Sequence, residues 1–212
     1  FGGSAHAIEA VINGSFEEPS PVGWVGGFGT YNHTTSVYYE GPAPAGAGDL
    51  YGWDPGISAP QVATQTISLA AGAAEVDAGT AAYDFNAWLS SWTGDTNYAV
   101  LSLDWFDTTT GSGSQLGTTI TFDGNDGSNP NLVGSADANG LADAGVAWTQ
   151  DNWSFYQSTG NVPSGARSAV ITYTGVGNDA YLDLVSLDLP FATLPPTMEI
   201  VINRDTGAIE IH

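Results

Sequence analysis

Oxygen-bearing side chains alternate with glycine in one stretch of the chain, Asp123-Gly124-Asn125-Asp126-Gly127. Carboxylate and amide oxygens are the ligands that Ca²⁺ prefers, and glycine permits the sharp turns that gather them around an ion. The stretch lacks the terminal bidentate glutamate of an EF-hand loop, so a polar loop without metal is the competing interpretation. Asp123, Asn125 and Asp126 are therefore candidate calcium ligands.

Side chains with the spacing needed for catalysis are hard to find in this sequence. The histidines His6, His33 and His212 show no metal-binding spacing such as H-E-x-x-H, and cysteine is absent. We find no G-x-S-x-G elbow and no phosphate-binding loop. A carboxylate pair for glycoside hydrolysis stays open because aspartate is abundant, but no pattern singles out a pair. We predict that the protein is not an enzyme.

The charge of the chain excludes several classes of partner. Two arginines, Arg167 and Arg204, stand against 23 acidic residues, and the formal net charge is −21 over 212 residues. Nucleic acid binding and attraction to anionic membranes both need basic side chains, so we expect neither. Membrane insertion is not expected either, because no apolar run approaches the roughly 20 residues of a spanning helix. A polyanion gains stability from salt or bound cations, which again favours Ca²⁺.

Composition and the first residues favour an exported protein. Charged residues make up 12% of the chain, about half of the usual share, so serine, threonine, asparagine and glycine must supply much of the surface. Ala5-His6-Ala7 matches the small-residue pattern before a signal peptidase cut, which fits either a chain processed upstream or a remnant of a signal peptide. We predict an extracellular or cell-surface location.

Seven tryptophans raise the question of sugar stacking. Most are expected in the core, because an indole buries a large apolar area. Trp53 and Trp92 lie in loop-like sequence, between Gly52 and Asp54-Pro55-Gly56 and before Thr93-Gly94-Asp95. These two are the candidate glycan-binding residues.

Strand patterns dominate the chain. Leu101, Leu103 and Trp105 alternate with Ser102 and Asp104, and residues 169–174 and 182–187 are also expected to be strands. Helix signals are nearly missing, since a glycine breaks the alanine-rich stretch 69–74. Many short strands separated by Gly, Pro, Asn and Asp predict an all-β protein, a β-sandwich of the jelly-roll type. Further strands are expected at 8–12, 62–69, 80–90, 117–122 and 152–158.

Both ends of the chain stand apart from this pattern. Pro195-Pro196 cannot continue a central strand and is typical of a stiff connector. The residues after it predict a β-hairpin, which alone is marginal in water and needs a partner surface. We therefore expect an N-terminal arm with the first strand at 1–12, a jelly-roll sandwich at 13–193, and a linker with a hairpin at 194–212.

The sequence also resembles a known family. An opening Asn13-Gly14-Ser15-Phe16-Glu17 and a closing strand from Tyr181 to Leu187, with the pattern Y-x-D-x-V-S-L, are similar to the galactose-binding-like jelly roll of secreted bacterial carbohydrate-binding modules. The resemblance covers about residues 8–191. The last residues resemble a short C-terminal unit found in large exported bacterial proteins. In that family the glutamate and aspartate of these motifs share a structural Ca²⁺, so the resemblance implies Glu17 and Asp183 as ligands.

Two functions fit these features. The main prediction is a Ca²⁺-dependent structural subunit that joins copies of itself into a surface filament or matrix, by strand addition at its ends. The alternative is a carbohydrate-binding or adhesion module of a larger secreted protein, with glycans as partners. The residues expected to carry assembly are Ile8, Val11, Ile200, Ile202, Ile209 and Ile211.

Overall fold

The structure is a computed structural model that describes residues 9–18, 22–27, 29–35, 39, 41–53, 60–94, 96–191, 200–202 and 209–211. Strands account for most of its regular elements, as the alternating sequence predicts. The elements are β1 Val25–Gly26, β2 Gly29–Asn32, β3 Leu50–Trp53, β4 Gln61–Ser68, a 3₁₀ turn Ala70–Gly72, α1 Ala73–Asp77, β5 Ala82–Ser91, β6 Tyr98–Phe106, β7 Gln115–Asp123, β8 Leu132–Ala136, β9 Ala142–Asp143, β10 Ser154–Asn161, β11 Ser168–Val176, β12 Ala180–Asp188, β13 Ile200–Ile202 and β14 Ile209–Ile211.

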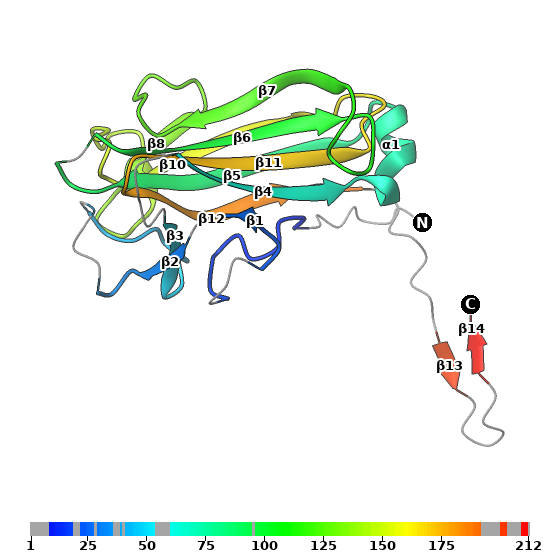
Figure 1. The fold of residues 1–212 in the computed structure, drawn as a ribbon, viewed down its shortest axis with the longest axis horizontal. Coiled ribbons are helices and arrows are strands. Elements are labelled where there is room, and N and C mark those ends of the chain that lie inside the picture. Colours follow the sequence, from blue (N-terminus) through cyan, green and yellow to red (C-terminus); the bar gives the residue numbers. More distant parts are fainter. Residues whose placement is uncertain are drawn as a thin grey trace.

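The described strands of the sandwich form two antiparallel sheets (Figure 1). One sheet has five strands in the order β1-β4-β11-β6-β7, and the other has seven in the order β2-β3-β12-β5-β10-β8-β9. Strands that are neighbours in sequence, such as β4, β5 and β6, alternate between the sheets, as in a jelly roll. The predicted all-β sandwich is confirmed.

The core lies between the sheets because inward positions on both are apolar. On β6, Leu101, Leu103 and Trp105 are buried, while the residues between them are partly exposed. Phe85 of β5 stacks on Phe122 of β7 with ring centroids 4.7 Å apart. Burying such side chains stabilises the fold by roughly 2 kcal/mol each.

Two local predictions were wrong. Residues 8–12 were expected to be a strand, but within residues 9–12 a single bridge joins Glu9 to Asp188. The alanine-rich stretch was expected to be irregular, but it forms the 3₁₀ turn and α1. Gly72 does not break α1, because it is the N-cap residue, a position that tolerates glycine, and the fully buried Val76 adds tertiary packing to this short helix. The described part of the chain contains no helix with the length and apolar character needed to cross a membrane.

A β-bulge divides strand β12. The register against β5 shifts between Asp183, which pairs with Trp88, and Ser186, which pairs with Asn86. A bulge places two residues opposite one and re-aims the side chains on either side of it. Leu182 before the bulge and Val185 within it are therefore both core residues, which simple alternation would not permit.

The predicted C-terminal hairpin is confirmed as β13 and β14. Ile200 pairs with Ile211, and Ile202 pairs with Ile209, in an antiparallel two-stranded sheet of its own. The proline linker that was expected to precede it lies outside the described residues, so the boundaries 1–12, 13–193 and 194–212 stay predictions.

Candidate functional site

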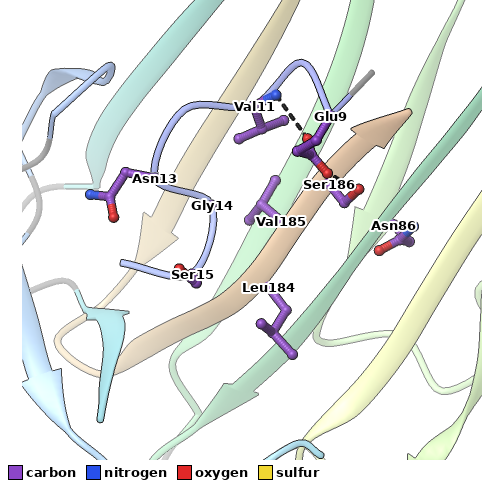
Figure 2. Close-up of a pocket in the computed structure, with 9 residues that line it drawn as sticks. All are labelled: Glu9, Val11, Asn13, Gly14, Ser15, Asn86, Leu184, Val185 and Ser186. Atoms are coloured by element: carbon purple, nitrogen blue, oxygen red, sulfur yellow. Dashed lines mark hydrogen bonds between the residues drawn. The ribbon is translucent and has the colours of Figure 1, made fainter. Parts of the chain in front are cut away.

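A hollow of about 400 Å³ opens beside the bulge of β12 (Figure 2). Its volume lies within the range of small-ligand sites. Strands β5 and β12 form one side of it and the loop before β1 forms the other. We call it the groove, and its lining consists of Glu9, Val11, Asn13, Gly14, Ser15, Asn86, Leu184, Val185 and Ser186.

Hydrogen bonds fix the acidic wall of the groove. Glu9 Oε1 accepts hydrogen bonds from the backbone N–H of Val11 at 2.8 Å and of Leu187 at 3.2 Å, and Glu9 Oε2 accepts one from the Ser186 hydroxyl. Nearby, burial and then the negative charges of Glu9 and Asp84 raise the pKa of Asp188. The groove therefore has a rigid carboxylate in a negative field.

Backbone strain is concentrated at the groove. Among the described non-glycine residues, positive φ angles occur at Asn13 (53°), Phe16 (58°) and Leu184 (48°). Asn13 and Leu184 line the groove, and Phe16 follows Ser15 of its wall. A bulky residue such as leucine rarely adopts this conformation, which costs roughly 1–3 kcal/mol. Such strain tends to be kept at functional sites, so it points to the groove as one.

An aromatic cluster continues from the groove over the outer face of the seven-stranded sheet. Leu184 lines the groove and also packs against this cluster. Trp88 and Phe155 pair across β5 and β10 with ring centroids 5.2 Å apart. The buried members of the cluster are Tyr51, Trp88, Ala136, Trp153 and Tyr181.

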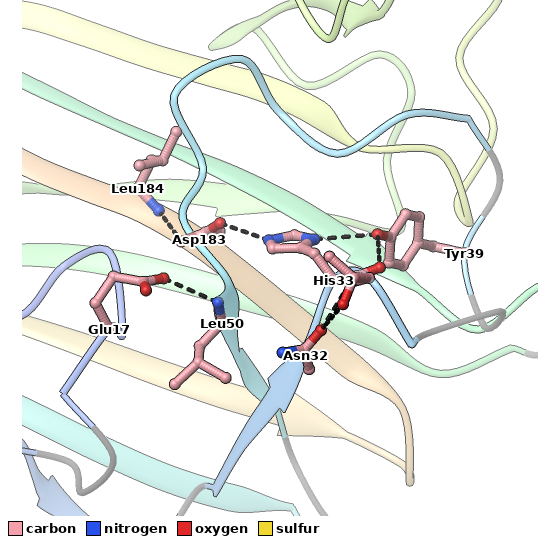
Figure 3. A network of polar contacts seen from close by, with 8 residues as sticks. Glu17, Asn32, His33, Tyr39, Leu50, Asp183 and Leu184 are labelled. Carbon is pink, nitrogen blue, oxygen red and sulfur yellow. Dashed lines mark hydrogen bonds and ion pairs between the residues drawn. The ribbon is translucent and has the colours of Figure 1, made fainter.

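A buried acid–imidazole pair, shown in Figure 3, adjoins this cluster, because the His33 ring packs against Tyr51 and Trp153. Asp183 of β12 is fully buried, and its Oδ2 lies 2.9 Å from Nε2 of His33. Its Oδ1 accepts a hydrogen bond from the Leu184 N–H at 2.7 Å. On the other side of the imidazole, Nδ1 lies 3.1 Å from the Tyr39 hydroxyl. The pair joins the turn after β2 to β12.

Burial dominates the acid–base behaviour of Asp183. Desolvation raises the pKa of Asp183 to about 6, although hydrogen bonding and charge from His33 and the Leu184 N–H act to lower it. The negative charge of Glu17 raises it further. Asp183 has no exposed surface, so a ligand in the surrounding solvent does not reach it in this structure.

The two carboxylates that the family resemblance assigns to Ca²⁺ are near each other. Asp183 feels the charge of Glu17, whose Oε1 accepts a hydrogen bond from the Leu50 N–H at 2.8 Å. Both oxygens of Asp183, however, already have protein partners, so the carboxylate is satisfied without a cation. Within the described residues, no group of three or more His, Cys, Asp or Glu could hold a metal ion. Shared calcium at Glu17 and Asp183 stays a prediction, which a melting curve in Ca²⁺ and then in EDTA would test.

The second calcium candidate forms turns in this structure. Asp123 Oδ1 accepts a hydrogen bond from the Asn125 N–H at 2.9 Å. Asp126 Oδ1 accepts hydrogen bonds from the N–H of Ser128 at 2.8 Å and from its hydroxyl at 2.6 Å, and these bonds lower the pKa of Asp126. This is ordinary Asx-turn chemistry. Calcium at Asp123, Asn125 and Asp126 also stays a prediction.

The two tryptophans chosen from the sequence lie at one end of the seven-stranded sheet. Trp53 is the last residue of β3 rather than part of a loop, and it packs edge-on against Tyr31. Trp92 follows β5 and is 42% exposed. Tyr181 of β12 pairs with Trp53 on one side and with Ser90 on the other, so Trp53 and Ser90 lie two strand spacings, roughly 10 Å, apart. Trp92 is two positions after Ser90 in the sequence. Ser186 of the groove is five residues further along β12, so these tryptophans are outside the groove.

The residues expected to carry assembly fall into three groups. Val11 is 7% exposed and belongs to the core of its own sandwich. Its neighbours hold the segment there, since the N–H of Ala10 donates to the Leu187 carbonyl and the N–H of Ile12 donates to the Gln65 side chain. Ile8 lies outside the described residues. Of Ile200, Ile202, Ile209 and Ile211 the structure describes the backbone pairing alone.

Sequence reasoning missed the groove and the role of His33. The groove joins residues from opposite ends of the chain, Glu9 and Ser186, to Asn86 in the middle, and no local motif marks such a meeting. His33 was recognised as a histidine without metal-binding spacing. Its partner Asp183 is 150 positions away, so spacing could not reveal the pair.

Comparisons with known proteins show a likeness of fold. No family model matches the chain, and no curated protein matches it. Among solved structures, the enzymatically active domain of bacteriophage CBA120 tailspike protein 4 has a TM-score of 0.52 at 16% identity, over 86% of this chain and 21% of that chain. This chain thus spans about a fifth of that tailspike chain.

Carbohydrate-binding modules are among the matches, as the sequence resemblance predicts. A family 16 carbohydrate-binding module has a TM-score of 0.48 at 12% identity, over 84% of this chain and 98% of that one. The C-terminal family 22 module of Clostridium thermocellum Xyn10B has a TM-score of 0.45 at 16% identity, over 91% and 98%. At such identities the likeness is one of fold alone, and of these three the tailspike domain alone scores above 0.5.

Proposed function

We propose that the chain is a non-catalytic carbohydrate-binding module of an exported protein, and that a neutral glycan binds in the groove beside the bulge of β12. The observation that carries this proposal is the groove itself. It combines an apolar floor of Val11, Leu184 and Val185 with amide, hydroxyl and carboxylate side chains, a mixture that suits the alternating C–H and O–H groups of a sugar.

The charge of the protein narrows the ligand class. None of the described residues that line the groove has a basic side chain, and the chain as a whole carries −21. Arg167, which the structure describes, forms an exposed ion pair with Asp77 and does not line the groove. Anionic ligands such as uronic-acid polymers or phosphates would be repelled, whereas a neutral polyol is not.

The carboxylates support binding rather than catalysis. Glycoside hydrolysis needs two carboxyl groups that flank the scissile bond. The groove lining contains one, Glu9, which accepts three protein hydrogen bonds and is held in place. The carboxyl with a pKa raised to about 6, Asp183, is fully buried and out of reach of a substrate.

The main prediction from the sequence, a Ca²⁺-dependent self-assembling filament subunit, finds no support in the described residues. Its N-terminal segment was expected to pair with a neighbour, but residues 9–12 pack on their own sandwich, with Val11 in the core. The glycan-binding proposal agrees with the presence of carbohydrate-binding modules among the solved structures of similar fold. An extracellular location follows from the same proposal.

Affinity electrophoresis would test this function directly. Native gels containing soluble neutral polysaccharides, such as xylan, galactan and mixed-linkage β-glucan, are compared with gels containing alginate or polygalacturonate. We expect retardation by at least one neutral polymer, loss of that retardation in Asn86→Ala, and free migration in the anionic gels. Free migration in every neutral gel would contradict the proposal.

A further inference from the structure

The outer face of the five-stranded sheet presents a row of hydroxyl groups. Thr172 of β11 lies directly opposite Thr64 of β4 on one side and Ser102 of β6 on the other, and Ser102 lies opposite Thr121 of β7. Residues opposite one another share a face, and neighbouring strands lie about 4.8 Å apart. These four residues, which we call the hydroxyl row, thus span about 14 Å across four strands.

The burial pattern shows that the hydroxyl row faces outward. Each of its four residues is partly exposed, whereas Ala63, Leu101, Phe122 and Tyr173, each next to a member of the row in sequence, are buried in the core. The Thr64 hydroxyl makes a weak contact of 3.5 Å with the Val25 carbonyl at the end of the row.

The positions flanking the hydroxyl row are mostly β-branched. Thr174 lies opposite Val62 and Val100 on one side of the row, and Val170 lies opposite Thr66 on the other. Side chains of this kind are stiff at χ1, so a partner that binds them freezes little side-chain entropy. The face is therefore a preorganised pattern of hydroxyl and methyl groups.

The hydroxyl row itself carries no charge, although the molecule is strongly acidic. Two carboxylates flank it: Asp104 lies opposite Val170, and Asp123 lies opposite Val100. Both are hydrogen-bonded, because Asp104 Oδ1 accepts from Gln115 Nε2 at 2.6 Å and Thr119 Oγ1 at 2.5 Å, and Asp123 Oδ1 accepts from the Asn125 N–H at 2.9 Å. An uncharged row between acidic side chains suits a neutral partner, and repulsion between acidic surfaces disfavours a second copy.

We propose that this face is a second glycan-binding surface, which lies flat on the surface of an insoluble neutral polysaccharide. The inference shares its ligand class with the proposed function, but it uses the opposite sheet. Each hydroxyl exchanges a bond to water for a bond to the ligand, with a small net gain, so several must act together. A packed polymer surface repeats its C–H and O–H groups and can engage the whole row, whereas a short soluble sugar cannot.

A depletion assay with two matched variants tests this proposal. Thr64→Val/Thr172→Val removes two hydroxyls at nearly constant shape, and Asn86→Ala alters the groove on the other sheet. Each protein is mixed with microcrystalline cellulose, chitin and insoluble xylan, and the unbound protein is measured. We expect the double variant to lose about tenfold in partition to the polymer that the wild type binds, with unchanged mobility in soluble-polysaccharide gels.

The outcomes separate the two proposals. Equal partition of the double variant and the wild type would overturn the second surface and leave the groove untouched. Loss of soluble binding in Asn86→Ala, together with retained partition to the solid, would support both. A wild-type protein that binds no soluble and no insoluble polysaccharide would overturn both. A dimer in light scattering that disappears in the double variant would show that another copy occupies the face, which also overturns this inference.

Discussion

The outer faces of the two sheets differ in the side chains that cover them. The seven-stranded sheet is covered by aromatic rings, a buried Asp183–His33 pair and a strained bulge that opens a groove. The outer side of the five-stranded sheet keeps a regular register over β4, β11 and part of β6, and it exposes hydroxyl and methyl groups. The buried Asp183–His33 pair and the strained backbone of Leu184 therefore lie together at the seven-stranded sheet, and that is where specific recognition is expected.

The largest effect should come from breaking the buried pair. His33→Phe keeps a ring against Tyr51 and Trp153 but removes the nitrogen 2.9 Å from Asp183 Oδ2. An unpaired buried carboxylate is costly, so we expect the free energy of unfolding to fall by about 3–5 kcal/mol at pH 7. Urea denaturation measures it.

A matched substitution on the other face sharpens this comparison. Asp104→Asn changes a partly exposed carboxylate whose partners are Gln115 and Thr119, and we expect a change of about 1 kcal/mol or less. Equal losses in the two variants would contradict a special role for the buried pair.

The second largest effect should be the pH dependence of stability that the raised pKa of Asp183 causes. Its folded-state pKa, about 6, lies above its unfolded value of 3.8, so the proton is held more tightly in the folded state. The stability contributed by this protonation is complete below pH 3.8 and is lost as the pH rises through 6. Relative to Asp183→Asn, the wild type should lose about 3 kcal/mol over that range, at about 1.4 kcal/mol per tenfold change in proton binding.

This comparison is made in buffer with EDTA, so that bound cations do not contribute. Exposed carboxylates such as Asp77 and Asp137, whose pKa values are lowered, titrate alike in both proteins and cancel. Parallel stability curves for wild type and Asp183→Asn would show that burial does not raise the pKa of this carboxyl.

A smaller effect is expected from the groove. Asn86→Ala removes an amide that lines it and donates to Asp84 at 3.3 Å. Losing one hydrogen-bonding group should weaken binding of a soluble neutral oligosaccharide about tenfold, which isothermal titration calorimetry measures. Thr172→Val on the opposite sheet should leave this affinity unchanged. If Thr172→Val weakened it as much, the ligand would not be in the groove.

The two tryptophans chosen from the sequence should differ in their effect on stability. Trp92 is 42% exposed and keeps much of its indole in water, so Trp92→Ala should cost about 1–2 kcal/mol in unfolding free energy, less than truncation of a fully buried tryptophan. Trp53→Ala removes a ring that packs against Tyr31 and should cost roughly 2 kcal/mol. Thermal denaturation of both variants checks the order, and a larger loss for Trp92 would contradict it.

Local pattern was enough to predict most of the fold. The alternation of Leu101, Leu103 and Trp105 identified β6, and the glycine-containing turn identified the C-terminal hairpin. The short helix at 73–77 could not be predicted in this way, because the burial of Val76 overrides weak local signals. The bulge could not be predicted either, because leucine at position 184 fits an ordinary strand and its positive φ angle is known from the structure alone.

The candidate site was less predictable because its chemistry is long-range. Glu17 and Asp183 were chosen together from a family resemblance, and the structure does bring them near one another. The partner that Asp183 has in this structure, His33, comes from the turn after β2 and was not linked to it by any spacing. Trp53 and Trp92 were chosen because they lie in loop-like sequence, whereas the groove depends on the loop at 13–15 meeting the bulge.

The most direct test of the account is an NMR titration of the ¹⁵N-labelled protein with the soluble neutral oligosaccharide that binds best. We predict shift changes at residues 13–15, at Asn86 and at 184–186 around the groove, with the amides of Thr64, Ser102, Thr121 and Thr172 unchanged. Changes that cluster around Trp53 and Trp92, or on the five-stranded sheet, would contradict the assignment of the groove as the glycan site.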